Sequence, residues 1–259
     1  MNLPFFFRAL SYFVMFGTML LLEKSAPYTE SVWQKRFRVA FHLGISIANS
    51  VLLYLIITWP LFASLSYSQT NLIGIRHIMG LNGWNEVVAT LVVFDLWDYW
   101  MHLANHRIGF LWRFHKAHHS DMDLDVTTAS RFHIGELVIS GLAKSVMIIV
   151  WGPSLLGLAV FDIMLTAASQ FHHCNVNIPF DMQTTMEKIV VTPRMHRCHH
   201  ALSKGCLDAN FSSILSFWDR LFRSYHLATE KLELEKVGLF KPRGPETMKI
   251  RAFLMTPFT

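Results

Sequence analysis

Charged residues are scarce in this chain. Only 16% of its 259 residues are Asp, Glu, Lys or Arg, whereas 52% are hydrophobic, and the mean hydropathy is +0.32. Soluble domains contain about a quarter charged residues, so this composition indicates a membrane protein. The net charge of +5 comes from scattered Lys and Arg that form no basic stripe, which argues against nucleic-acid binding. The length suits a single domain.

Cysteine is also scarce. The three cysteines are an odd number without CxxC spacing, so we expect no disulfide framework and a reducing, cytosol-facing location. We expect Cys198 and Cys206 to be small packing residues. The sequence contains no HPGG segment and no GxGxxG segment, so no haem-binding or flavin-binding domain is fused within it.

Long apolar stretches are present instead, and they predict membrane helices. Residues 4–22 favour a retained helix over a signal peptide, because no clear cleavage site follows. Basic residues between this stretch and the next predict a cytoplasmic loop. The further stretches are 39–66, which ends near Trp59-Pro60 or shortly beyond, 86–106, and the two arms of 134–172, which Gly152-Pro153 divides. We predict an all-α membrane protein with about four transmembrane helices and a cytosolic, histidine-lined cap.

The segment 134–172 resembles a helical hairpin. Each arm has about 18 residues, or roughly 27 Å at 1.5 Å per residue, close to the thickness of one bilayer core. Lys144 and Asp162 lie at similar distances from the turn, so we predict that they form an ion pair across the hairpin. The alternative is that one arm lies shallow and Lys144 extends to the interface.

Histidines occur at metal-ligand spacing in three places. HxxxH at 102–106 places two imidazoles at i and i+4, and HxxHH at 115–119 and 196–200 each adds a third at i+3. Eight histidines exceed what one ion needs, and a structural zinc site takes only four closed ligands. Imidazole suits zinc, iron, copper and nickel, so ligand type leaves the metal open. Two redox metals beside a lipid-facing cavity suggest oxygen activation.

Two carboxylates share a helix face with the first histidine pair. On an α-helix Asp95, Asp98, His102 and His106 fall within an arc of about 80°. Charges inside a span are costly and mark function. Asp98 is well placed to accept the second ring N–H of His102, and Asp95 less directly. Polar packing inside a helix bundle is the alternative for both.

The chain resembles the fatty acid hydroxylase superfamily, also called the sterol desaturase family. The resemblance covers roughly residues 85–225. The motifs that carry it are DYWMHLANH, FHKAHHSD, RFHIGE, FHHCNVNIP, TPRMHRCHHA and DANFSSILSFWDRLF. The resemblance implies an integral membrane non-haem di-iron enzyme, and it divides the chain into N-terminal membrane helices (1–84), a catalytic domain (85–225) and a cytosolic tail (226–259).

The same resemblance implies the ligand set. RFHIGE adds His133 to the three histidine motifs, and FHHCN adds His173 in preference to His172. The expected metal ligands are His102, His106, His115, His118, His119, His133, His173, His196, His199 and His200. No catalytic residue beyond them is expected, apart from Asp95 and Asp98 as possible outer partners.

Some positions depart from the family pattern or lie outside it. The segment after the last motif usually reads Asn-Tyr-Gly and later Gly-Thr, but Phe211-Ser212 and Arg223-Ser224 stand here. This difference affects the substrate subclass more than the chemistry. We interpret His42 as lying near the start of a helix, and His77 and His226 as loop or surface residues. Pro193 is expected to begin the helix that presents the last motif.

The implied function is O₂-dependent hydroxylation or desaturation of a lipid by C–H abstraction. The lipid is of sterol, fatty acyl, sphingolipid or alkylglycerol type. The expected cofactors are two iron ions, with O₂ as co-substrate and two electrons from an external donor, either a separate electron-transfer protein or a pterin. We expect a multi-pass protein of the bacterial inner membrane, otherwise of the endoplasmic reticulum, with its histidine motifs facing the cytosol.

Two other functions remain open at this stage. The first is a histidine-rich membrane metal transporter or metal-binding protein, which would place its histidines along a span rather than at the cytosolic ends of helices. The second is a family member that has lost turnover, against which all the motifs are intact. The sequence does not determine the lipid, the choice between hydroxylation and desaturation, the electron donor or the oligomeric state.

Overall fold

Helices make up all the regular structure of the described part of the chain. The computed structural model describes residues 3–31, 34–229, 234, 236–241 and 245–259. Within these residues the only β-type pairings are isolated bridges. This confirms the all-α prediction. The long helices are α1 (Leu3–Ser25), α2 (Lys35–Ile56), α3 (Thr58–Asn71), α5 (Gly83–Arg107), α7 (Ile134–Trp151) and α8 (Leu155–His173).

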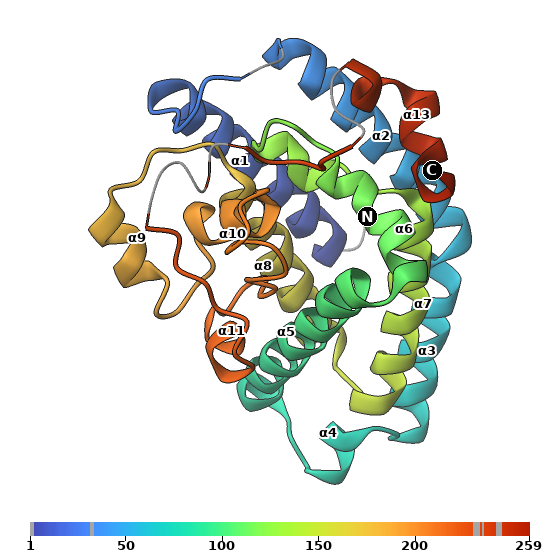
Figure 1. Cartoon of the computed structure of the whole chain (residues 1–259). Helices are drawn as coiled ribbons and strands as arrows, with labels where there is room; N and C mark the ends of the chain where they lie inside the picture. Colours follow the sequence, from blue (N-terminus) through green and yellow to red (C-terminus); the bar gives the residue numbers. More distant parts are fainter. Residues whose placement is uncertain (1–2, 32–33, 230–233, 235, 242–244) are drawn as a thin grey trace.

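Shorter helices connect and cover these. They are α4 (Ile75–Ile78), α6 (Gly109–His119), η1 (Val126–Ser130), α9 (Phe180–Met186), α10 (Pro193–His200), α11 (Phe217–Leu221), η2 (Pro245–Met248), α13 (Ile250–Met255) and η3 (Thr256–Phe258). In Figure 1, α10 lies near the middle of the molecule, close to α8. The short helices α9, α10 and α11 lie away from α3, α4 and α7 in the same view.

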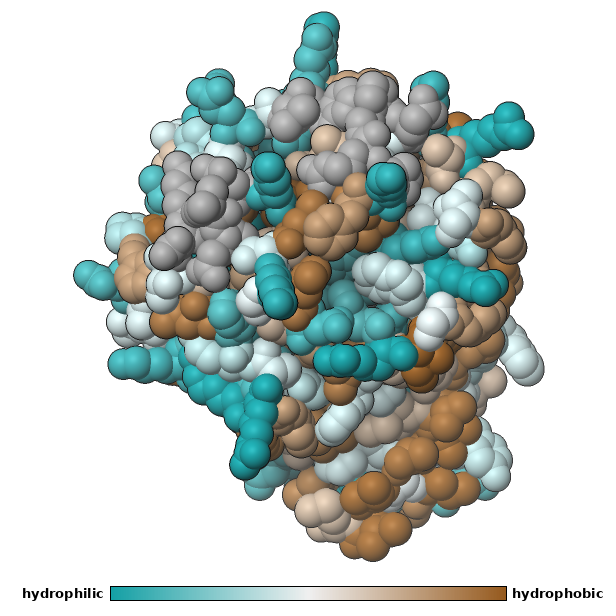
Figure 2. Space-filling view, viewed as in Figure 1, coloured by the Kyte–Doolittle hydropathy of each residue, from teal (hydrophilic) through white to brown (hydrophobic). Residues whose placement is uncertain are grey.

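Four of the long helices are long and apolar enough to cross a membrane. Among the described residues these are α2, α5, α7 and α8. The outward faces of α2 and the adjoining α3 carry large apolar side chains, such as Tyr54 of α2, which is 71% exposed, and Trp59 of α3, which is 75% exposed. Figure 2 shows hydrophobic residues gathered over the end of the molecule that holds α3, α4 and α7, with hydrophilic residues over the opposite end. Exposed apolar area of this extent fits contact with lipid.

The second apolar stretch forms two helices instead of one long one. α2 ends at Ile56 and α3 begins at Thr58. Pro60 lies in the first turn of α3, where a missing backbone N–H costs no intrahelical hydrogen bond. α3 continues to Asn71 and packs along α7. The first apolar stretch forms the helix α1, as predicted. This helix packs along α8, but it is not among the four candidate spans.

The predicted turn between α7 and α8 is confirmed. Gly152 has a φ of +79° and closes the end of α7, and a Cβ there would lie 2.6 Å from the carbonyl oxygen of Ile73. A residue with a side chain is therefore excluded by both conformation and space. Lys144 of α7 forms an ion pair with Asp162 of α8, as predicted, and the ammonium also lies over the ring of Phe161. Pairing offsets part of the cost of placing each charge inside a span.

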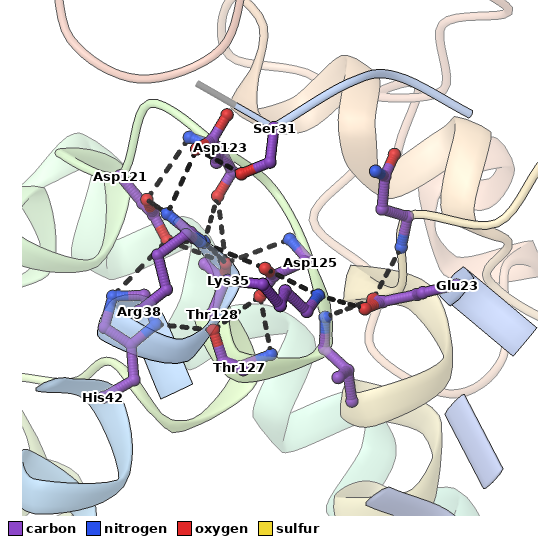
Figure 3. A network of polar contacts seen from close by, with 12 residues as sticks. Glu23, Ser31, Lys35, Arg38, His42, Asp121, Asp123, Asp125, Thr127 and Thr128 are labelled. Atoms are coloured by element: carbon purple, nitrogen blue, oxygen red, sulfur yellow. Dashed lines mark hydrogen bonds and ion pairs between the residues drawn. The ribbon is translucent and has the colours of Figure 1, made fainter. Parts of the chain in front are cut away.

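A buried polar network attaches α2 to the segment between α6 and α7. The guanidinium of Arg38 is fully buried and donates to Asp121 at 2.6 and 2.9 Å and to Asp125 at 3.0 Å. Figure 3 shows these side chains converging, with Lys35 reaching Asp125 and Glu23 from the start of α2. Asp125 also caps η1 by accepting from the backbone N–H of Thr127 at 2.8 Å. The network positions the residues that follow the second histidine motif.

The C-terminal residues pack on α2, α6 and Arg131 rather than extending from them as a separate tail. Phe253 of α13 is buried against Phe41 of α2, and the Arg131 guanidinium lies 4.9 Å from its ring centroid. Arg131 also donates to the carbonyl of Thr247 at 2.8 Å. The η3 turn lies along α6. The described part of the tail therefore covers the end of the molecule that holds the second histidine motif.

Candidate metal centre

Nine of the ten predicted ligands converge in two groups of donor atoms. Within each group all the donor atoms lie within 4.8 Å of one another. We call these two groups site 1 and site 2. Site 1 contains His102, His106, His115, His119 and His199, and site 2 contains His118, His173, His196 and His200.

The helical spacing explains how each HxxHH motif serves both sites. In α6 the i and i+4 residues, His115 and His119, belong to site 1, whereas His118 at i+3 belongs to site 2. In α10 the allocation is reversed, because His196 and His200 belong to site 2 and His199 to site 1. Residues at i and i+4 lie one above the other on a helix, so each pair addresses one position. The two motifs are therefore complementary halves of one centre.

The remaining candidate ligands come from two of the candidate spans, α5 and α8, which both end at this level. His102 and His106 lie one turn apart at the end of α5, and His173 is the last residue of α8. The two sites are adjacent, since the rings of His119 and His200 stack with their centroids 4.2 Å apart. The start of α10 is set by Thr192, whose side chain accepts from the Met195 N–H at 3.3 Å, with Pro193 in the first turn. This confirms the predicted start of the last motif helix.

The ring nitrogens in site 2 approach one another closely. The Nε2 atoms of His173 and His118 are 3.1 Å apart, those of His196 and His173 are 3.0 Å apart, and those of His200 and His196 are 3.2 Å apart. In site 1 the Nε2 atoms of His115 and His119 are 3.2 Å apart. Two nitrogens bound at right angles about 2.1 Å from one ion lie about 3.0 Å apart. The spacing of the nitrogens therefore fits a shared metal ion.

Proton positions in site 2 exclude a direct hydrogen bond between two of these nitrogens. His173 Nδ1–H donates to the Ser169 carbonyl at 2.7 Å, and His118 Nδ1–H donates to the Arg131 carbonyl at 3.2 Å. A neutral imidazole carries one ring proton, so both Nε2 atoms present lone pairs to each other at 3.1 Å. Two facing lone pairs repel unless a cation lies between them. This arrangement is the strongest structural indication of a metal.

Site 1 shows the same deficiency of donors. His199 Nδ1–H donates to the Ala209 carbonyl at 2.8 Å, so its Nε2 is an acceptor. The Nε2 atoms of His199 and His106 are both buried, and neither has a hydrogen-bond partner within the described structure. A buried acceptor without a donor costs about 1–3 kcal/mol. A bound cation removes that cost, so the residues present fit a metal in both sites.

Outer partners orient the ligand rings. His115 Nδ1–H donates to Glu136 at 2.8 Å, and His102 Nδ1–H donates to the carbonyl of Phe211 at 2.8 Å. Such bonds fix the tautomer and strengthen the nitrogen that faces the metal. The backbone carbonyls have no sequence signal, because any residue supplies one. Glu136 could have been identified from the sequence, because it is the last residue of the RFHIGE segment that contains His133.

Burial keeps these imidazoles neutral. It lowers the pKa of His199 to about 3. Burial, reinforced by neighbouring histidines, lowers the pKa of His118, His119, His196 and His200 well below the ordinary value of about 6.5. Neutral imidazole is the form that binds metal.

His133 is the one predicted ligand that the structure places outside both groups. Its Nδ1 accepts from the Gly135 N–H at 3.0 Å and so caps the start of α7, and its Nε2–H donates to the Leu254 carbonyl at 3.3 Å. Both ring nitrogens therefore have partners within the protein. The neighbouring His172 also lies outside the groups, with its Nδ1–H donating to Ser213 at 3.1 Å, so site 2 contains His173 as expected.

Asp95 and Asp98 bind residues 213–215, which follow the Phe211 carbonyl that accepts from His102. The Asp95 carboxylate accepts from the N–H groups of Ile214 and Leu215 at 3.2 and 3.1 Å and from the indole of Trp218 at 2.8 Å. Asp98 accepts from the Ser213 hydroxyl at 2.5 Å. Neither accepts from His102, whose Nδ1 proton goes to Phe211 instead. The expected direct contact of Asp98 with His102 is thus replaced by a contact through residues 211–215.

The histidines outside the motifs have other partners. His42 is buried in α2 and lies 2.7 Å from the Thr127 hydroxyl, as part of the polar network described above. His77 lies in the short helix α4, 2.9 Å from Arg76. His226 lies close to Cys198 and Cys206, so it is not simply a surface residue.

Comparison with known proteins gives the family. The fatty acid hydroxylase family model matches residues 87–224, just over half of the chain. The chain is 29% identical over 150 residues to the human alkylglycerol monooxygenase, which covers 58% of this chain and 32% of that protein. It is 32% identical over 153 residues to an ornithine lipid hydroxylase of Rhizobium tropici, covering 54% of this chain and 42% of the relative.

A third relative matches over a greater length. A methylsterol monooxygenase of Arabidopsis thaliana is 23% identical over 207 residues, which cover 78% of this chain and 77% of that protein. The chain spans about a third of the length of the alkylglycerol monooxygenases that it matches. No solved structure matches the chain significantly. With four candidate spans and a family match that covers all of its histidine motifs, this chain belongs to the fatty acid hydroxylase family as a multi-pass membrane protein.

Proposed function

We propose that this protein is an O₂-dependent di-iron enzyme that hydroxylates or desaturates a membrane lipid. The relatives are named for lipid hydroxylation or monooxygenation, and this supports lipid oxidation as the general reaction. The single observation that carries the metal-dependent part is the pair of facing, unprotonated Nε2 atoms of His173 and His118 at 3.1 Å.

The nine imidazoles of sites 1 and 2 would hold the two ions. Bound iron supplies the oxygen activation that attack on an unactivated C–H bond requires. Nitrogen ligands alone fit several metals, so the choice of iron follows from the family and from the reactions of the relatives. His133 was expected as a further ligand, but it caps α7, and we assign it no ligand role.

The protein's own residues prepare the centre. Backbone carbonyls of residues 209 and 211 and the Glu136 carboxylate hold the ring protons on Nδ1, so that Nε2 stays free of a proton. The burial of α10 keeps water from the ligands, since all eight of its residues are buried. A dry, pre-organised site limits side reactions of activated oxygen. Two electrons would come from a separate carrier or a pterin.

The substrate would enter from the bilayer. The ligands lie at the ends of α5 and α8, two candidate spans, so the centre is at the level where a span meets the membrane surface. We propose that this side is the cytosol, in a bacterial inner membrane, with residues 85–225 as the catalytic domain. The relatives are named for alkylglycerol, ornithine lipid and methylsterol, which share an amphipathic lipid character.

Purified full-length protein in lipid nanodiscs tests the proposal. We expect about two irons per chain and O₂ uptake that requires both reductant and iron. His118→Ala and His173→Ala should each reduce the bound iron and abolish uptake. Metal transport into vesicles without O₂ consumption would instead support a metal transporter, and bound iron without O₂ uptake in lipid of any of the three classes would contradict the enzyme.

A further inference from the structure

Two cysteines and a histidine gather beside α10, outside sites 1 and 2. The Sγ atoms of Cys198 and Cys206 and a ring nitrogen of His226 all lie within 4.8 Å of one another. Both cysteines are fully buried, and His226 is partly buried. The three positions are too irregularly spaced in sequence to form a recognisable metal motif, and we had expected the cysteines to be packing residues.

The surrounding backbone holds each of the three donors in place. Cys198 lies in α10 between the ligand residues, and at about 100° per residue it faces away from His196 and His200. Cys206 lies in a turn closed by its N–H donating to the Ser203 carbonyl at 3.0 Å. These contacts are made by the main chain, so they do not depend on the cysteine side chains.

Asn210 fixes the third donor. Its amide donates to the carbonyls of Met195 and His226 at 3.0 Å each, and its own oxygen accepts from the His226 N–H at 2.9 Å. Asn210 adopts a left-handed φ of +59°, which Asn tolerates better than most residues. The His226 backbone is thereby attached to α10 through one buried side chain. The cluster is a pre-arranged site rather than an accidental approach of loops.

The chemistry of the donors points to a thiophilic ion. Thiolate and imidazole ligands suit zinc and related divalent ions, which bind sulfur at about 2.3 Å and nitrogen at about 2.0–2.1 Å. Two sulfurs at that distance from a tetrahedral ion lie about 3.8 Å apart, within the spread of the observed donors. The cysteines are not joined to each other in a disulfide.

We propose that Cys198, Cys206 and His226 form a third metal site, which takes a zinc-class divalent ion. The ion would join α10 to the loop at 201–210 and to the segment that follows residue 224. With three protein ligands the site would not be a closed structural zinc site, but the ion would still hold the helix that carries His196, His199 and His200 against the chain that covers it. Three protein ligands leave one position for water, in keeping with the partial exposure of His226. The site shares no ligand with sites 1 and 2.

Cobalt binding tests this proposal without relying on activity. Cobalt(II) added to the iron-loaded, full-length protein in nanodiscs should bind at one equivalent and give a thiolate-to-metal absorption band in the near ultraviolet. Sites 1 and 2 contain only nitrogen donors, so cobalt there gives no such band. X-ray absorption at the cobalt edge should also show sulfur neighbours at about 2.3 Å.

Matched variants localise the band. It should disappear in Cys206→Ser and persist in Cys174→Ser, which removes the other buried cysteine from a separate part of the core. Cobalt bound to the wild-type protein without a sulfur neighbour would overturn the proposal, whether or not the variants fold. So would a band that survives Cys206→Ser, or a Cys198–Cys206 disulfide detected by mass spectrometry in the protein as isolated.

Discussion

The position of the proton on each histidine ring determines which nitrogen can bind a metal ion. Each ligand of known tautomer has one nitrogen that donates to an oxygen and one that faces a neighbouring imidazole, as for His118 and His173. The oxygen acceptors are mostly main-chain carbonyls. Only His115 uses a side-chain carboxylate, that of Glu136. The tautomers of the centre are therefore determined by where the backbone runs.

At this scale the motifs predicted most of the centre. The spacings HxxxH and HxxHH depend only on helix geometry, so eight of the nine histidines that converge in sites 1 and 2 were predicted from the residues alone. The choice of His173 over His172 followed the family pattern, and the structure places His173, and not His172, among the donors of site 2. His133 lies at the start of α7, where its ring caps the helix. A histidine in a sequence motif can face either a metal site or the backbone. The sequence pattern therefore did not distinguish a ligand candidate such as His173 from a helix cap such as His133.

The first prediction concerns this difference between two histidines. His133→Asn should retain both irons, because Asn also caps helix starts and preserves an acceptor for the Gly135 N–H. His173→Asn should lose iron from site 2 and with it the activity. The test is to measure the iron content per chain of both variants after gel filtration in a buffer that contains a chelator. Equal iron loss in both variants would make His133 a ligand after all.

The second prediction concerns Glu136. Glu136→Gln keeps the shape of the side chain but removes the negative charge that His115 Nδ1–H donates to. Loss of such an outer partner weakens metal binding by about 10–100-fold. We expect a chelator to remove one of the two irons from this variant more easily, since His115 belongs only to site 1. Asp181→Asn, on the exposed surface of α9, is the control and should match the wild type. Unchanged iron retention in Glu136→Gln would show that the carboxylate does not tune site 1.

The helices and their connections decide how the ligands meet. The turn at Gly152-Pro153 and the Thr192-Pro193 cap were both predictable, because each depends on local backbone preferences of a few residues. Pro60 indicated an end of the second stretch close to the break between α2 and α3, but the new helix α3 was not predicted, because apolar residues continue through the break. The attachment of α2 by Arg38 joins residues more than eighty positions apart, which no local pattern reveals.

The third prediction uses the ion pair inside the hairpin. Lys144→Met should lower the melting temperature in detergent, because Asp162 is left charged and without its ammonium partner. The double variant Lys144→Met with Asp162→Leu should regain most of the loss, since apolar residues replace a buried pair at little cost. A double variant as unstable as the single one would mean that the pair has a role beyond mutual neutralisation.

The fourth prediction is a pH dependence of stability from the α2 network. Burial alone raises the pKa of Asp125, but the charges of Arg38 and Lys35 outweigh it and hold that pKa well below the ordinary value. The folded state therefore favours the ionised carboxylate. This contribution is fully present above the unfolded pKa of about 3.9 and is lost as the pH falls through the lower folded value.

Asp125→Asn should accordingly cost about 3 kcal/mol or more of stability near neutral pH, as for other buried pairs that lose one partner. The difference in melting temperature between wild type and variant should shrink as the pH is lowered below about 4. Asp181→Asn again serves as the control. A difference that stays constant down to about pH 2 would show that the charge of Asp125 does not support the fold.

The whole molecule combines an apolar end with a more polar end. The apolar surface around α3, α4 and α7 lies at one end, and the short helices that cover the centre lie toward the other (Figures 1 and 2). Composition predicted this division, because a chain so poor in charge has too few polar residues to cover both ends. The packing of α13 against α2 and Arg131 was not predictable. The tail contains many charged residues, and the residues that Phe253 contacts lie more than a hundred positions away in the sequence.

The fifth prediction fixes the orientation in the membrane. Lys116 of α6 donates to the carbonyl of Thr259, so this residue lies on the same side of the membrane as the second histidine motif. A green fluorescent protein fused after Thr259 should fluoresce in bacterial cells, which requires a cytosolic position. A fusion that is dark but active as a periplasmic alkaline phosphatase would place the centre on the opposite side.

The central claim is that nine imidazoles hold two irons that oxidise a membrane lipid with O₂. The most direct measurement supplies heavy-isotope O₂ and reductant to iron-loaded protein in vesicles of alkylglycerol, ornithine lipid or methylsterol composition, followed by mass spectrometry of the lipids. We predict that the wild-type protein yields a lipid that has gained one labelled oxygen or lost two hydrogens, and that His173→Asn yields neither. Unchanged lipids in all three compositions, with both irons bound and reductant present, would contradict the account.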